Sequence, residues 1–344
     1  MRHIGFAALT LILPLLAACE APQPRKLQPI AQPQPAAEIA AKAPLQQAPA
    51  PVDKVQHVKE IALLPFGSGP QQIGQVSAGE QNPEGPMALD ADQNGRVCVL
   101  DQVNARVQCL LADGTWQQIA VSRTAQDLAI AADGALLTLD RLVAHNVQKI
   151  SNQAKLLNTW PLDPQQAPLT TALFERQSQP WIELEHRDVQ SVGPTPVVQQ
   201  GRLTADGRWL LLGLKVPPNQ VAITGQVPKI TPQVPTPAQE SPPGQTLLAA
   251  FKLPVWQIVE LAGDTKGHLW LVVDLVQLDA KDMPVQRLRQ AVIFDDQTRE
   301  IARYDLCVPD GPQEQFRTAK LGGNGHLYSM CLQSNGLHVQ EVSL

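Results

Sequence analysis

Five cysteines are the residues of this 344-residue chain whose chemistry depends most on where the fold places them. Cys98 and Cys109 are equidistant from the Val103-Asn104 dipeptide, so a symmetric hairpin would place them directly opposite each other. Facing strand residues lie about 4.5–5.5 Å apart, within reach of a disulfide. Cys307 and Cys331 fall in neighbouring units of the chain, which allows a second pairing but does not establish it. Buried free thiols are the alternative, and no Cys-x-x-Cys or histidine cluster predicts a metal site.

The fifth cysteine ends a short apolar segment at the start of the chain. Arg2 and His3 precede an apolar run over residues 4–16, which ends in Leu16-Ala17-Ala18-Cys19. This pattern indicates an export signal over residues 1–18 that is too short to span a membrane. Its ending resembles the lipobox of bacterial lipoproteins, which implies lipidation of Cys19 after cleavage of the signal. With Glu20 next, the resemblance favours the outer membrane in a Gram-negative source. The alternative is an ordinary secretory signal.

Residues 19–57 have the composition of a tether. They are rich in Pro, Ala and Gln and carry little apolar bulk, so they cannot offset the entropy cost of ordering. The full chain has 44% hydrophobic and 17% charged residues, which is the composition of a globular protein. A formal net charge of −5 argues against a nucleic-acid partner. We therefore expect a disordered Pro-rich tether between a membrane anchor and one folded domain over residues 58–344.

That domain contains an internal repeat of strand, Gly-ended turn and strand. The turn glycines that mark the copies are Gly95, Gly134, Gly207, Gly267 and Gly325. The first gap is 39 residues (134 − 95) and the second is 73 (207 − 134), which leaves room for one more copy. Residues 173–184 fit as a degenerate copy that has lost its Gly. Six units of about 40 residues predict an all-β, six-bladed β-propeller.

The first unit carries the most specific pattern. It reads Gly95-Arg96-Val97-Cys98-Val99-Leu100-Asp101, then a turn with Asn104, then Arg106-Val107-Gln108. This order resembles the blades of NHL-repeat propellers. The strand over residues 58–66 has no place in the first unit, so we expect it to complete the last blade and remove the open edge of the sheet. An open stack or a sandwich is the alternative architecture.

Two enlarged loops suggest a binding face. A Pro-rich insertion at about 215–254 and a charged segment at 277–289 are both expected between the second and third strands of their blades. In a propeller these loops lie on the face that also carries the blade-to-blade connections, and long loops on one face are typical of binding surfaces. The alternative is a solvated insertion without a partner.

Aligning the repeats predicts which side chains line the channel mouth on that face. The candidate binding residues are Glu84, Gln126, Gln199, Trp256, Gln257, Phe316 and Arg317. Trp256 and Phe316 could stack on a ligand, although core packing is the simpler explanation. Asn82-Pro83-Glu84-Gly85-Pro86 resembles the start of gluconolactonase-like propellers, in which the Glu binds the metal. We expect Glu84 to pair with Arg317 instead, and the remaining metal ligands are missing from the predicted ring.

The function expected from the sequence is non-enzymatic. No nucleophile motif, phosphate loop or dinucleotide fingerprint is found, and no cofactor is expected. The leading hypothesis is an envelope lipoprotein whose propeller binds a protein, peptide or glycan. The alternative is a propeller enzyme of the lactonase or lyase type that uses Glu84, and a structural spacer is a third reading. Fold class does not decide among them, because propellers host both binding proteins and enzymes.

Overall fold

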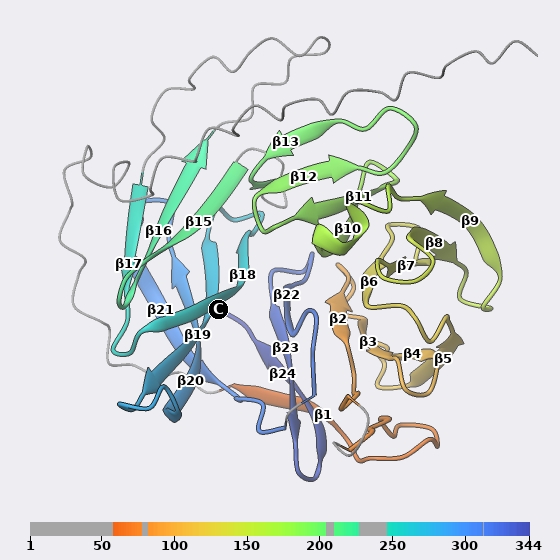
Figure 1. Ribbon diagram of the computed structural model, residues 1–344, viewed down its shortest axis with the longest axis horizontal. Helices are drawn as coiled ribbons and strands as arrows, with labels where there is room; N and C mark the ends of the chain where they lie inside the picture. The colour runs from red at the N-terminus through yellow and green to blue at the C-terminus, as the bar shows by residue number, and fades with distance from the viewer. Residues whose placement is uncertain (1–57, 78–81, 204–209, 227–245, 312) are drawn as a thin grey trace, which may run out of the picture. The chain divides into compact units, whose positions relative to one another are not determined.

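A computed structural model describes residues 58–344, except 78–81, 204–209, 227–245 and 312. The described residues form six four-stranded antiparallel sheets arranged around a common centre (Figure 1). The predicted six-bladed β-propeller is therefore confirmed. The signal, Cys19 and the tether lie outside the described residues. No helix in the described part of the chain is long and apolar enough to cross a membrane.

The first three blades follow the chain, from inner to outer strand. Their strands are β2 (Ala88–Ala91), β3 (Val97–Asp101), β4 (Arg106–Leu110) and β5 (Trp116–Ala120); β6 (Asp127–Ile130), β7 (Leu136–Asp140), β8 (Asn146–Ile150) and β9 (Leu156–Pro161); and β10 (Thr170–Arg176), β11 (Gln179–Leu184), β12 (Asp188–Ser191) and β13 (Val198–Gln200). A 3-10 helix, η1 (Ala167–Leu169), precedes β10.

The last three blades continue the same order, except that the outermost strand of blade six comes from the start of the domain. The strands are β14 (Arg202–Leu203), β15 (Leu210–Val216), β16 (Gln220–Gln226) and β17 (Thr246–Ala250); β18 (Val255–Gly263), β19 (Leu269–Leu278), β20 (Pro284–Phe294) and β21 (Glu300–Leu306); and β22 (Ala319–Leu321), β23 (Leu327–Gln333), β24 (Gly336–Val342) and β1 (Lys59–Leu64). The expected closure by the first strand is confirmed, because β1 pairs antiparallel with β24.

The repeat glycines do what the sequence suggested. Gly95, Gly134, Gly267 and Gly325 all have φ between 78° and 90°, in the turns that join the first and second strands of their blades. Such left-handed conformations cost a Gly nothing in steric strain. In blade three, whose copy lacks the Gly, Gln177 and Ser178 adopt φ of 51° and 59° in the equivalent turn.

The structure corrects the prediction for blade four. The range 215–254, predicted as one loop, contains the strands β16 and β17. The connection from β15 to β16 is only three residues long, 217–219. The Pro-rich segment 227–245 instead connects β16 to β17, so it leaves from the opposite face, the one with the Gly-ended turns. Pro217 and Pro218 lie in the short turn between β15 and β16, and they hid the strand pattern on either side of it. The expected extension in blade five is present as a long β19–β20 hairpin.

Apolar clusters hold neighbouring blades together at five of the six seams. Leu100 of blade one packs with Leu128 of blade two, and similar buried clusters join blades two and three, four and five, five and six, and six and one. Among the described residues no such cluster joins blades three and four. The seam there is crossed by an ion pair between Glu183 and Arg202.

Candidate functional site

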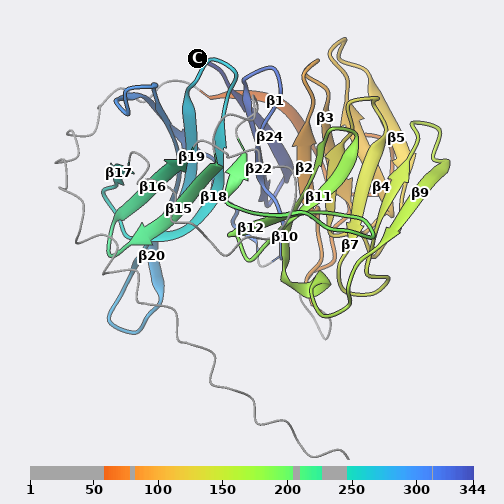
Figure 2. The same cartoon turned by 90° about the horizontal axis from the view of Figure 1, so that it is seen from above.

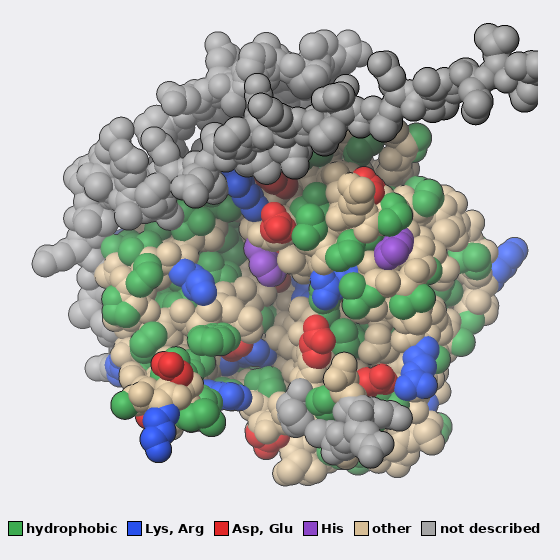
Figure 3. Space-filling view, viewed as in Figure 1, with side chains coloured by type: hydrophobic (Ala, Val, Ile, Leu, Met, Phe, Trp, Pro, Cys, Tyr) green, Lys and Arg blue, Asp and Glu red, His purple; other side chains and the backbone are tan. Residues whose placement is uncertain are grey.

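The channel mouth is the end of the central channel where the inner strands begin. We define it by Gln126, Arg141, Thr171, His186 and Phe316. Figure 2 shows that η1 and the tip of the β19–β20 hairpin extend from the same side of the ring. In Figure 3, which views the molecule from this side, histidine, acidic and basic side chains lie beside a furrow near the middle of the face.

One histidine at the mouth is oriented by a buried carboxylate. His186 lies in the turn between β11 and β12, and its side chain is 65% exposed, whereas that of Glu183 is only 1% exposed. The Nδ1 atom of His186 is 3.0 Å from Oε1 of Glu183. The Oγ1 hydroxyl of Thr171 donates to the same carboxylate oxygen at 2.9 Å and accepts the backbone N–H of His186 at 3.1 Å. The imidazole is therefore fixed at its Nδ1 edge while its ring faces solvent.

Glu183 is kept ionised in spite of its burial. Nε and Nη2 of Arg202 both donate to its carboxylate, the latter at 2.9 Å. Burial alone would raise the pKa of Glu183, but the Arg202 charge and the hydrogen bonds from His186 and Arg202 outweigh it and hold the pKa well below its usual range. The mouth thus contains a fixed negative charge directly behind His186.

The backbone turn that presents His186 is unusual. Glu185 and His186 adopt φ of 52° and 56°, a left-handed conformation that is uncommon for residues other than Gly, Asn and Asp. Two consecutive positive φ angles are what a two-residue hairpin turn requires. The turn at this position therefore carries functional-group side chains where Asn-Gly is the usual choice, and such strain is often found at functional sites.

A second group at the mouth centres on Arg141. Its Nη1 atom donates to the carbonyl oxygens of Pro168 and Thr170 at 2.8 and 3.3 Å. The guanidinium carbon lies 4.8 Å from the centroid of the Phe316 ring. The backbone N–H of Arg141 donates to Oε1 of Gln126 at 2.9 Å. Arg141 therefore brings together two residues, Gln126 and Phe316, that the sequence placed at the mouth.

Deeper in the channel, Arg317 joins blades one, two and six. It donates from Nε to Oδ1 of Asp127 at 3.0 Å and from Nη2 to the carbonyl oxygen of Leu128. Its Nη1 atom lies 3.9 Å from Oδ1 of Asp90, and that oxygen is buried without a hydrogen-bond partner among the described residues. Burial raises the pKa of Asp127 to about 6, although Arg317 and backbone N–H groups act in the opposite direction.

The structure does not assemble the other predicted site residues into one site. The expected Glu84–Arg317 pair is wrong, because Glu84 pairs with Arg123 at 3.0 Å on the surface and Arg317 pairs with Asp127. The predicted position of Gln199 at the channel mouth is also wrong. It lies on β13, the outermost strand of blade three, where it accepts from Arg176.

The two predicted residues of blade five lie at the start of its inner strand. Trp256 is 58% exposed, and the amide of Gln257 donates to Oδ2 of Asp274 at 2.6 Å. No contact with the mouth group joins them in the described residues. They therefore form a separate surface beside the base of the β19–β20 hairpin.

Four residues of the mouth and channel were missed. Arg141 and His186 lie in the turns after the second strands of blades two and three, whereas the prediction aligned only the starts of the inner strands. Glu183 and Arg202 were missed because the degenerate third copy shifted the register of blades three and four. A usable signal was present, since Glu183 interrupts the apolar run Trp181-Ile182-Glu183-Leu184 of a strand. A charged residue inside a buried strand is rare unless it is paired.

The metal implied by the gluconolactonase-like resemblance does not fit the residues found. In the described part of the chain, no group of three or more His, Cys, Asp or Glu side chains could hold a metal ion. Glu84, the residue that carries the resemblance, is bonded to a guanidinium, and the channel carboxylates of Asp127 and Glu183 face Arg317 and Arg202. These are ion-pair environments, so no metal-dependent step is derived from them.

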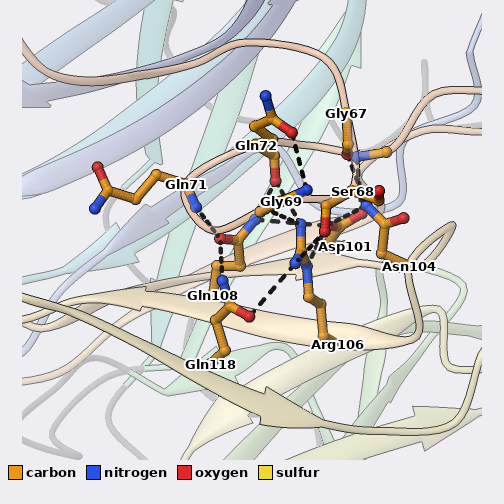
Figure 4. Close-up of polar contacts among 11 residues, drawn as sticks. Gly67, Ser68, Gly69, Gln71, Gln72, Asp101, Asn104, Arg106, Gln108 and Gln118 are labelled. Carbon is orange, nitrogen blue, oxygen red and sulfur yellow. Dashed lines mark hydrogen bonds and ion pairs between the residues drawn. The ribbon is translucent and has the colours of Figure 1, made fainter.

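The residues that resemble an NHL blade have a structural role. Asp101, Asn104, Arg106 and Gln108 converge on the segment 67–74 that leads from β1 into blade one (Figure 4). Arg106 donates to the carbonyl oxygens of Ser68, Gly69 and Gln72 at 2.7–2.9 Å and to Asp101 at 2.8 Å. We call this segment the strap. It ties the closing strand to the first blade.

Both expected disulfides are present. Cys98 and Cys109 face each other on β3 and β4, with their Cα atoms 4.0 Å apart. Cys307 and Cys331 are also bonded, with a Cα separation of 5.8 Å, and this bridge ties the connection that leads into blade six to β23. The second pairing, which the sequence left open, is therefore settled.

Comparison with known proteins finds distant structural similarity, while no family model matches the chain and no curated relative was found. Solved structures that are similar include virginiamycin B lyase from Staphylococcus aureus, at 10% identity over 78% of this chain and 98% of that one, with a TM-score of 0.42. A DUF4221 member from Bacteroides vulgatus matches at 9% identity over 83% and 97%, TM-score 0.47. A luciferin-regenerating enzyme matches at 10% identity over 75% and 91%, TM-score 0.44. The propeller assignment rests on the strand topology of the chain itself.

Proposed function

We propose that this protein is an exported propeller enzyme that carries out proton transfer on a small ligand at the channel mouth, with His186 as the general base. The observation that carries the proposal is the pairing of an exposed imidazole with a buried, ionised carboxylate. Two of the solved structures named above are enzymes, but that likeness extends to the fold alone. The proposal therefore rests on the mouth residues and replaces the non-enzymatic reading that the sequence favoured.

The chemistry follows from the orientation of the ring. A carboxylate next to Nδ1 favours the tautomer that carries its proton there, so Nε2 is free to accept a proton from a ligand or a water molecule. In ester or lactone hydrolysis, Nε2 takes a proton from the attacking water while the water oxygen bonds to the carbonyl carbon. The bond between that carbon and the leaving oxygen then breaks, and the leaving oxygen receives the proton from the imidazolium. The Glu183 carboxylate stabilises the imidazolium formed between the two steps.

The cellular setting of this enzyme is part of the proposal. The lipobox-like ending at Cys19 favours a lipid anchor, and the tether over residues 19–57 favours a domain held away from the bilayer. Two oxidised cysteine pairs are typical of a compartment outside the cytoplasm. In a Gram-negative source, the anchor would hold the enzyme at the outer membrane.

The proposal is tested by replacing the base and a matched histidine. Purified full chain is assayed against a panel of lactones and against virginiamycin B, together with the variants His186→Ala and His268→Ala. His268 is the control because its Nδ1 is 2.9 Å from Asp264 Oδ2, in a turn on the opposite face. We expect His186→Ala to lower kcat by about a hundredfold or more and His268→Ala to leave it unchanged. Equal activity in both variants, or no turnover of any member, contradicts the proposal.

A second candidate function is supported by the β19–β20 hairpin. Its tip carries Met283 and Val285, which are 60% and 63% exposed, and Trp256 near its base is 58% exposed. Exposed apolar side chains on a projecting hairpin suit the binding of an envelope protein, peptide or glycan. If the hairpin binds such a partner, Val285→Ser combined with Met283→Ser should abolish capture of it, whereas Leu156→Ser on blade two should not.

A further inference from the structure

Arg141 is held in place without using all of its donors. Two backbone carbonyls fix Nη1, and the Phe316 ring covers one face of the guanidinium. The Nε atom is buried and has no hydrogen-bond partner among the described residues, and no bond from Nη2 is seen there either. A buried donor without a partner is unfavourable, so a ligand that accepts from this group would remove that cost.

We propose that Arg141 binds the carboxylate of the ligand that enters the channel mouth, a proposal that rests on the mouth being a ligand site. The guanidinium presents Nε and Nη2 along one edge, and two parallel N–H donors match the two oxygens of a carboxylate. Its position is set by Pro168, Thr170 and Phe316, so little side-chain entropy is lost when the anion binds.

The surroundings of Arg141 define the rest of the ligand. The next two residues along the chain, Leu142 and Val143, are 53% and 66% exposed, and Leu169, which lies between the two residues whose carbonyls bind Arg141, is 44% exposed. These exposed apolar side chains lie on the two segments that position Arg141. The ligand class is therefore a small carboxylate with an apolar body, bound with its charged end at Arg141.

The same strand anchors both Arg141 and the proposed base. Arg141 donates to the carbonyl oxygen of Thr170, and the backbone N–H of His186 donates to the hydroxyl of Thr171. Because these two anchors are consecutive residues of β10, the guanidinium and the imidazole are attached to neighbouring points of one strand.

The experiment compares a carboxylate probe with its neutral counterpart. Binding of 3-phenylpropionate and of 3-phenylpropionamide is measured by calorimetric titration of the full chain and of the variants Arg141→Gln, Arg299→Gln and His186→Ala. Arg299 is the control because it is 70% exposed and pairs with Asp295 in a turn on the opposite face. Thermal unfolding of each variant establishes that it is folded.

We expect the acid to bind the wild type at least about tenfold more tightly than the amide, and Arg141→Gln to remove that preference. Arg299→Gln and His186→Ala should retain it. Equal affinities for acid and amide, no saturable binding of the acid at about 10 mM, or an unchanged preference in Arg141→Gln overturns the proposal. If His186→Ala binds the acid and also keeps its turnover, the proposal that His186 is the general base is wrong while the carboxylate site at Arg141 stands. The two proposals can therefore fail independently.

Discussion

At the scale of single residues, the channel is shaped by charges that the fold takes out of water. Asp90 and Asp127 face the single guanidinium of Arg317, and the side chains of all three are 7% exposed or less. One cation cannot fully compensate two carboxylates at this depth, because desolvation is large and an unpaired buried charge is costly. Burial is the main cause of the raised pKa of Asp127, and the charge of the neighbouring Asp90 adds to it.

The titration of Asp127 should be visible in the pH dependence of the unfolding free energy. Its pKa of about 6 in the folded protein exceeds the ordinary value of 3.8, so between about pH 4 and pH 6 the folded state keeps a proton that the unfolded chain has released. The contribution of this residue to the unfolding free energy therefore falls as the pH rises through that window. A displacement of about two pKa units corresponds to about 3 kcal/mol. Asp127→Asn should lack this fall in urea unfolding at pH 4–7.

The measurement is the difference in unfolding free energy between wild type and Asp127→Asn at each pH. This difference is needed because carboxylates with lowered pKa values, such as Glu183, make stability rise with pH. Parallel pH profiles for the two proteins would show that Asp127 titrates normally.

At the scale of the elements, the strap joins the closing strand to blade one. Arg106 holds the strap in place by donating to three of its carbonyl oxygens, and it also pairs with Asp101, whose side chain is 0% exposed. Strap residues 67–74 make few strand pairs of their own, so these side-chain bonds determine their position. The NHL-like pattern in the sequence is therefore explained by a local structural need.

Arg106→Ala should be strongly destabilising. It removes the cation beside a buried carboxylate together with three hydrogen bonds to strap carbonyls, which together cost about 3–5 kcal/mol. Arg299→Ala, which removes an exposed ion pair of similar length, should cost less than about 1 kcal/mol. Chemical denaturation of both variants provides the comparison, and similar losses would show that the strap does not depend on Arg106.

At the scale of the whole molecule, the ring depends on β1. The strand pairs with β24, and its last residue, Leu64, is fully buried in the cluster that joins blades six and one. Closure of this kind leaves blade six with four strands and covers an edge that could otherwise pair with another chain. Apolar clusters of this type join five of the six pairs of neighbouring blades.

Deletion of residues 58–64 should open the ring. We expect a loss of more than about 5 kcal/mol, which is comparable to the whole stability of many domains, together with aggregation through the exposed β24 edge. Removal of an equal length of the tether, residues 35–41, is the control. Size-exclusion chromatography and thermal melting followed by circular dichroism give the readouts. A deletion variant that stays monomeric with an unchanged melting temperature would mean that β1 does not close the ring.

The architecture was predictable because its causes are local and repeated. Turn glycines at Gly95, Gly134 and Gly267 specify hairpins wherever they occur, and units of equal length can bury their faces only against one another. The Cys98–Cys109 pair followed from hairpin symmetry alone. Blade four was misread because prolines at 217–218 lie in a turn between two strands, and Pro is compatible with both a short turn and a long loop.

The sequence by itself therefore determined the six blades, the closing strand and the first disulfide, since each depends on neighbours along the chain or on an exact repeat. Only the tertiary structure decided the mouth. His186 and Glu183 are three residues apart, but Arg202 comes from another blade, and Arg141 reaches Phe316 across 175 positions of sequence (316 − 141). Such contacts depend on where the inner strands begin, and a shift of one residue moves a side chain to the other face of its sheet.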